Sequence, residues 1–307
     1  MRLNSKLLLH AAAAALLLTA ELPAMAQAGA AVATLRYTLA MPAPQTHYFE
    51  VKMDLGGFPA DYTDVKMPVW APGSYLVREF AKNVEGFQAR TAGGQALAVE
   101  KLNKNTWRVR HPKQASFQIS YRVYAFELSV RTSFIDADHG YLNGSSVFMY
   151  PADNKGLGST VVVQPAAGWA QVSTALRPAT GKFTYKAASY DELADSPIEI
   201  GNHKVLEFTA NGTLHQVAMY GTYTVDEARL VADMKKVCEE AQRVIGQNPL
   251  DHYLFIVHNL ERGSGGLEHL YSCTIEKSRA TWWGVPLAVN SSTLWLPISM
   301  GESASSS

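Results

Sequence analysis

Hydrophobic and polar residues alternate over short runs between residues 35 and 190. In FEVKMDL, residues 49–55, the apolar side chains fall on one face and the charged ones on the other, as is typical of a half-buried strand. FQISYRVY, residues 117–124, repeats this pattern. Glycine and proline pairs separate such runs, for example Pro72-Gly73. We therefore expect residues 27–190 to form an N-terminal β domain, an antiparallel sandwich.

The pattern becomes mixed after residue 190. Asn211-Gly212 lies between two apolar runs, and this pair favours a two-residue hairpin turn. A helix follows, with Thr224 and Glu227 as a predicted capping box and Gly246 at its C-terminal end. Its predicted apolar stripe consists of Leu230, Met234, Val237, Ala241 and Val244.

Two further apolar runs, HYLFIVHNL and LEHLYSCTI, predict strands on either side of a glycine-rich loop. Hairpin, helix, strand, loop and strand are the elements of an α+β domain. We expect residues 191–279 to be the start of such a domain.

The first 26 residues have the features of a secretory signal peptide. A basic start precedes the apolar run Leu7–Ala20, and Ala24-Met25-Ala26 fits a cleavage site. A membrane anchor is the alternative, but about 14 apolar residues are fewer than the roughly 20 that a spanning helix needs. Residues 1–26 therefore predict export to the periplasm or the outside, without a transmembrane segment after signal removal.

Charge and cysteine content limit the class of partner. Basic and acidic residues are equal at 27 each, which argues against nucleic acid as a partner. In an oxidising compartment Cys238 and Cys273 can form a disulfide, but two cysteines define no framework, and buried free thiols are equally ordinary. The sequence leaves both states of the cysteines open.

Three separated segments resemble the glycyl-aminopeptidase family of zinc metallopeptidases. These signature segments are MPVWAPGSYLVREFAKNV at Met67–Val84, ADSPIEIG at Ala194–Gly201 and GSGGLEH at Gly263–His269. The resemblance implies an N-terminal β domain followed by a thermolysin-like catalytic domain, usually with a PDZ domain downstream. It also implies zinc as the cofactor and removal of N-terminal residues such as glycine or alanine from peptides.

The third signature segment carries the expected substrate-binding residues. Glu268 matches the family's glutamate that binds the N-terminal amine, and a shielded carboxylate makes a strong hydrogen bond to an ammonium group. Gly265 and Gly266 would let an extended peptide approach and pair along the strand that begins at Leu267. The alternative is a plain glycine-rich turn with Glu268 in solvent.

The catalytic motif of the family is absent from this sequence. H-E-x-x-H places two zinc ligands four residues apart on a helix, with the glutamate as general base. None of the nine histidines is four residues from another. His252 and His258 can share a strand face, but no third ligand is indicated. We therefore expect no catalytic residue, no metal ligand and no bound zinc in this chain.

Residues 280–307 contain Glu302 as their only charged residue and show no helical periodicity. We interpret them as an aberrant or unassigned tail after a truncated catalytic domain. Two functions stay open: the inactive N-terminal part of an exported metallo-aminopeptidase, or a non-catalytic periplasmic module that binds a peptide or protein.

Overall fold

A computed structural model describes residues 32–246 and 250–278. The predicted signal peptide and the tail at 280–307 lie outside these residues. Within the described residues the chain forms four β-sheets, named A to D here, with three α-helices and two short 3-10 helices. The helices are α1 (Gly144–Val147), α2 (Tyr190–Ala194), α3 (Glu227–Ile245), η1 (Pro44–Thr46) and η2 (Phe80–Asn83).

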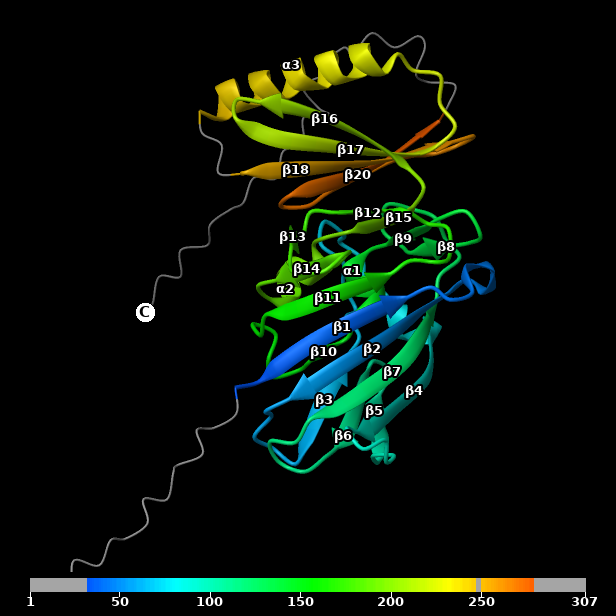
Figure 1. Cartoon of the computed structure of the whole chain (residues 1–307), viewed down its shortest axis with the longest axis vertical. Coiled ribbons are helices and arrows are strands. Elements are labelled where there is room, and N and C mark those ends of the chain that lie inside the picture. The colour runs from blue at the N-terminus through cyan, green and yellow to red at the C-terminus, as the bar shows by residue number, and fades with distance from the viewer. Residues whose placement is uncertain (1–31, 247–249, 279–307) are drawn as a thin grey trace, which may run out of the picture. The chain divides into compact units, whose positions relative to one another are not determined.

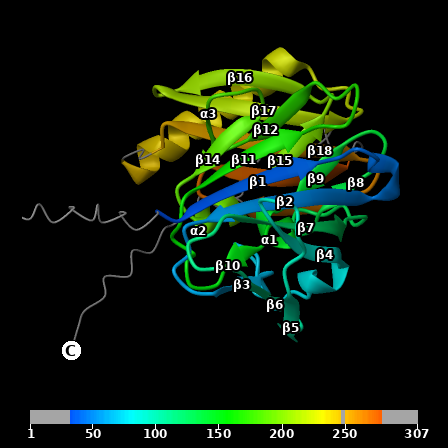
Figure 2. The same cartoon turned by 60° about the horizontal axis from the view of Figure 1, so that its bottom comes forward.

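Sheets A and B contain most of the N-terminal strands. The order in sheet A is β13 (Arg177–Pro178), β14 (Thr184–Ala187), β11 (Ser159–Gln164), β1 (Thr34–Ala40), β2 (Tyr48–Gly56), β7 (Phe117–Tyr124) and β4 (Val84–Thr91), and most of it can be followed in Figure 2. The order in sheet B is β10 (Tyr150–Pro151), β3 (Tyr62–Lys66), β6 (Thr106–Arg110) and β5 (Val99–Asn103).

Sheets C and D contain the remaining strands. The order in sheet C is β12 (Gln171–Thr174), β15 (Ile198–Gly201), β9 (Gly140–Leu142) and β8 (Phe134–Ile135). The order in sheet D is β16 (Lys204–Ala210), β17 (Thr213–Gly221), β18 (His252–Leu260), β20 (Ser272–Ser278) and β19 (Ser264–Glu268). The prediction of a mainly β fold with several antiparallel sheets is confirmed. Parallel pairs also occur: β1 with β11 in sheet A, and β17 with β18 and β18 with β20 in sheet D.

The largest apolar core belongs to the N-terminal β domain. The alternation seen in the sequence buries Phe49, Val51 and Met53 of β2 against side chains of sheet B such as Val65 and Val109. Strand β15 begins beyond residue 190, yet it pairs with β9 and β12 inside sheet C. Its isoleucines, 198 and 200, point into this same core.

A smaller apolar cluster joins sheet C to sheet D. Tyr141 of β9 packs with Leu254 and Ile256 of β18, and its hydroxyl donates a 3.0 Å hydrogen bond to Oγ1 of Thr274 on β20. Since side chains alternate along a strand, one face of β15 and β9 meets the N-terminal core while the other meets sheet D.

Helix α3 covers the other face of sheet D (Figure 1). Its contacts come from Leu230, Val231, Met234 and Cys238, so the predicted stripe is wrong in part: Val237 and Val244 are 36% and 78% exposed. The buried stripe of α3 is rotated relative to the predicted one, because Val231 packs on sheet D beside Leu230. Among the described residues, no helix is long and apolar enough to cross a membrane.

The ends of the local elements are set by turn and cap residues. Asn211 and Gly212 both have positive φ, 46° and 86°, which confirms the predicted hairpin turn between β16 and β17. Gly246 ends α3 with φ of 82°, as predicted. The predicted capping box is wrong, because the N-cap is Asp226, whose carboxylate accepts a hydrogen bond from the backbone N–H of Arg229.

Candidate functional site

The predicted substrate-binding residues lie together on the edge strand of sheet D. Gly265, Gly266 and Glu268 belong to β19, which pairs antiparallel with β20. The sequence placed the glycines in a loop, whereas the structure has them inside the strand. Among the described residues β19 has no second strand partner, so alternate backbone N–H and C=O groups face outward.

Glu268 lies on the face of sheet D that α3 also covers. Its register partner is Cys273, which is paired in turn with Phe255 of β18, a residue packed against the α3 cluster. Burial, with a further contribution from the Glu268 carboxylate, raises the pKa of the Cys273 thiol to about 12. No cation pairs with Glu268 within the part of the chain that the structure describes.

Gly266 shares this face, and Gly265 points to the other one. A Cβ placed on Gly266 would lie 3.6 Å from Oε1 of Glu268, so the carboxylate extends over the bare backbone. A Cβ on Gly265 would instead meet Val130 and Glu276 at 3.5 Å. The two glycines thus remove side chains from opposite faces of one edge strand.

The first signature segment contacts this strand through a glycine. Gly73 has φ of 69°, and a Cβ there would lie 2.7 Å from Cδ1 of the buried Leu267. Only a glycine both adopts this backbone conformation readily and leaves room for the leucine. The segment 67–84 therefore packs directly on β19.

The second signature segment holds the end of β19 through Asp195. One carboxylate oxygen of Asp195 lies 2.8 Å from Nδ1 of His269, and the other accepts a 2.9 Å hydrogen bond from the backbone N–H of Leu270. All three signature segments consequently meet around the same strand, although they are far apart in the sequence.

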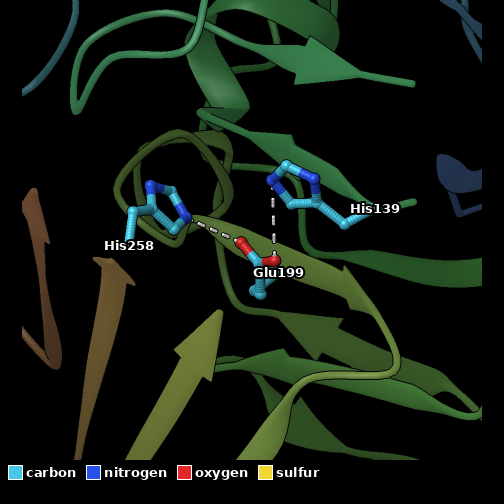
Figure 3. Close-up of side chains that lie close together, drawn as sticks. All are labelled: His139, Glu199 and His258. Atoms are coloured by element: carbon cyan, nitrogen blue, oxygen red, sulfur yellow. Dashed lines mark hydrogen bonds and ion pairs between the residues drawn. The ribbon is translucent and has the colours of Figure 1, made fainter. Parts of the chain in front are cut away.

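A second group of polar residues is buried between sheets C and D. His139, Glu199 and His258 are 1%, 0% and 0% exposed, and their side chains point toward one another in Figure 3. Nε2 of His258 lies 2.9 Å from Oε2 of Glu199, and Nε2 of His139 lies 4.0 Å from Oε1. We call these three residues the buried trio.

Local structure positions each member of the buried trio. Glu199 is the central acid of β15, on the face opposite Ile198 and Ile200. Asp136 accepts hydrogen bonds from the backbone N–H groups of Asp138 and His139, and this turn orients His139 just before β9. The His139 ring then stacks on Tyr220 of β17.

Burial controls the charge of the histidines in this region. It lowers the pKa of His139 to about 4, an effect that the Glu199 carboxylate opposes, and it also lowers the pKa of His203 to about 4. Because desolvation disfavours the charged imidazole, both rings are neutral at pH 7. Neutral imidazole is the form that donates a lone pair to a metal.

The buried trio does not fit the catalytic zinc site of the resembled family. That site uses the helical H-E-x-x-H pattern, which this sequence lacks, whereas the trio comes from strands and a turn. His258 pairs in register with Glu276, so it projects from the face of sheet D opposite to Glu268.

Comparison with known proteins identifies the family of the N-terminal part. Residues 36–202 match the peptidase M61 N-terminal domain. The chain belongs to this family. The matched range includes the first two signature segments as well as His139 and Glu199. No curated protein sequence matches the chain.

A solved structure shows the same fold over most of this chain. An aminopeptidase N family protein from Idiomarina loihiensis superposes with a TM-score of 0.76 at 29% identity, covering 80% of this chain and 43% of that protein. The chain thus spans less than half the length of that structure. An M1 zinc metallopeptidase from Deinococcus radiodurans gives a TM-score of 0.48 at 13% identity, covering 79% and 59% of the two chains.

His139 and Glu199 carry no local sequence signal and were not predicted as site residues. His258 was predicted to lack a third ligand, whereas the structure brings two potential ligands beside it. Glu199 alternates with isoleucines, a pattern that also describes an ordinary strand with a solvated acid. Only the packing of sheet C on sheet D distinguishes the two cases.

Proposed function

We propose that this chain is the N-terminal, substrate-binding part of an exported metallo-aminopeptidase of the glycyl-aminopeptidase type. The observation that carries the proposal is the edge strand β19, which places two glycines and Glu268 where an extended peptide can pair. The signature segments support the finer assignment. Under it, residues 1–26 are a signal peptide, and further catalytic and PDZ domains belong to the complete protein.

The backbone of β19 would bind the peptide by adding a strand to sheet D. Edge-strand pairing uses main-chain hydrogen bonds and therefore tolerates many side chains. At Gly265 and Gly266 nothing projects from β19, so the backbone of a ligand can lie close to it. The exposed apolar side chains Tyr75, Leu76 and Val77 follow Gly73, which itself contacts β19, and they can contact a ligand residue.

Glu268 would select peptides with a free N-terminus. Its carboxylate lies over Gly266 and has no cationic partner among the described residues. An ammonium group placed there makes a hydrogen bond in which both donor and acceptor are charged, whereas an acylated amine offers only a neutral N–H. The residues present bind and orient the peptide; the zinc ligands and general base of the family are not among them, so hydrolysis requires residues beyond this chain.

A non-catalytic module that binds peptides or proteins in the periplasm is the second candidate function. The absence of the H-E-x-x-H pattern from the sequence favours it, and the same edge strand would serve. Both functions require peptide binding at β19, so that step is tested first.

The test is an NMR titration of the full chain with trialanine and with its N-acetylated form. We expect trialanine to shift the amide signals of β19 and to bind more tightly than the blocked peptide. Glu268→Gln should weaken trialanine binding by about 10- to 100-fold, because a hydrogen bond to a charged group contributes about 1.5–3 kcal/mol.

Glu207→Gln is the matched control, since Glu207 lies on β16 at the opposite edge of sheet D. It should leave trialanine binding unchanged. Equal affinity for free and acetylated trialanine, an unaffected Glu268→Gln variant, or no shift in β19 at any concentration would each refute the proposed site.

A further inference from the structure

The buried trio has the composition of a metal site. We propose that His139, Glu199 and His258 bind one divalent transition-metal ion, of the zinc type, that fastens sheet C to sheet D. This site is separate from the peptide-binding strand and does not depend on the proposed function.

The spacing of the potential ligand atoms is close to that of a tetrahedral site. One ligand atom from each residue lies within 4.8 Å of the others. Zinc holds nitrogen and oxygen ligands at about 2.0–2.2 Å, so neighbouring ligand atoms are about 3.4 Å apart. Nε2 of His139 and Oε1 of Glu199 are 4.0 Å apart, so their separation must shorten by about 0.6 Å to reach the tetrahedral value.

Unpaired polar atoms support a ligand at this position. Nδ1 and Nε2 of His139, Oε1 of Glu199 and Nδ1 of His258 are buried and have no hydrogen-bond partner among the described residues. Buried polar atoms are normally paired, and a buried carboxylate without a compensating charge is costly. A divalent cation compensates the charge of Glu199 and takes up free lone pairs of the trio.

An outer carboxylate completes the pattern. Nδ1 of His139 lies 3.8 Å from Oδ1 of Asp136, on the side of the ring away from Glu199. Histidine ligands commonly donate their second ring N–H to such a carboxylate, which fixes the ring and raises its basicity. Asp136 therefore occupies the position of an outer partner of His139.

The donor set and its burial indicate the type of metal and its role. Two imidazoles and one carboxylate suit zinc better than calcium or magnesium, which prefer oxygen ligands. The almost complete burial of the trio leaves no surface for a substrate. The ion would act on structure, by linking the strand β15 and the turn before β9 to β18.

Cobalt(II) and zinc(II) titrations of the untagged full chain test the site. After chelator treatment and dialysis, we expect one equivalent of cobalt to give the visible absorption of a tetrahedral site, and zinc to displace it. At a hundredfold excess of free zinc over Kd, the melting temperature should rise by about 5–10 °C. The sequence has no H-E-x-x-H motif, so this motif cannot contribute to the signal.

Variants assign the ligands. Glu199→Gln and His258→Gln should remove the stoichiometric cobalt spectrum, and Asp136→Asn should weaken binding by about 10- to 100-fold, as expected for an outer partner. His215→Gln is the matched control: this histidine is also buried in sheet D, but it stacks on Phe208 in the cluster under α3. It should bind cobalt like the unaltered chain.

If a variant fails to fold, an NMR measurement on the unaltered chain still tests the site. In the unaltered chain, zinc should shift the imidazole NMR signals of His139 and His258 and leave that of His215 in place. Absence of stoichiometric metal in the unaltered chain would show that Glu199 and His258 form only a buried hydrogen bond. Equal binding by folded Glu199→Gln would also overturn the proposal.

Discussion

His258 and Glu268 lie on opposite faces of sheet D. Their register partners on β20 are Glu276 and Cys273, an odd number of positions apart, and side chains alternate along a strand. The buried trio is therefore directed at sheet C, while the proposed amine-binding carboxylate is directed at the side of α3. A metal at the trio cannot contact a peptide held at Glu268 through that face.

Gly73→Ala should destabilise the chain by about 1–3 kcal/mol, because an added Cβ meets Leu267 and the backbone is left-handed there. Equilibrium denaturation measures the loss. Gly94→Ala is the control: its φ is 82°, but a Cβ would have nothing within 4 Å, so it reports the backbone cost alone. Should the two losses be equal, Gly73 does not pack closely on Leu267.

Asp195→Ala should loosen the end of β19. The substitution removes two hydrogen-bond acceptors and leaves Nδ1 of the buried His269 without its partner, at a cost of about 1–3 kcal/mol. Hydrogen exchange of the β19 and β20 amides should accelerate. Asp191→Ala, an exposed position in helix α2 four residues before Asp195, should change stability by less than about 0.5 kcal/mol. Similar effects for both variants would contradict the role of Asp195.

The two cysteines should resist alkylation in the folded chain. The structure has both as free thiols, and burial raises the pKa of Cys238 to about 11 and that of Cys273 to about 12. Only the thiolate reacts, so at pH 8 the thiolate fraction of Cys238 is about 100-fold below that of a thiol with its ordinary value. The rate of alkylation should keep rising as the pH is raised above 8, because the pKa values of both thiols lie well above that pH.

Mass spectrometry after iodoacetamide treatment at pH 8 checks this prediction. Native protein should gain almost no label, and protein unfolded in guanidinium should gain two labels. Failure of the unfolded, unreduced chain to react would instead indicate a disulfide. The native structure itself argues against that bond, because it has Cys238 on α3 and Cys273 on β20 as separate thiols.

Local patterns predicted local elements well. Alternation identified β2 and β7, and Asn211-Gly212 identified the hairpin of β16 and β17, because these signals depend on neighbouring residues. The N-cap of α3 was assigned to Thr224 instead of Asp226, since both types of residue can cap a helix and only backbone geometry separates them.

The two sites differ in how far apart their residues lie in the sequence. Gly265, Gly266 and Glu268 are contiguous, so a resemblance of one short segment was enough to select them; their role stays a prediction. The buried trio combines residues from two sheets and a turn, and Glu199 and His258 are 59 positions apart in the sequence. No sequence spacing indicates that contact, which arises from the packing of Tyr141 against Leu254 and Ile256.

The contacts of Gly73 with Leu267 and of Asp195 with His269 restrict how such chains can recombine. Both contacts join the family-matched range, residues 36–202, to the strand that follows it. A chimera that takes its first 202 residues from one relative and β19 from another would combine surfaces that were not selected together. Inheritance should therefore keep the β domain and β19 together, and a crossover between residue 202 and β19 should be tolerated only where both contacts are preserved.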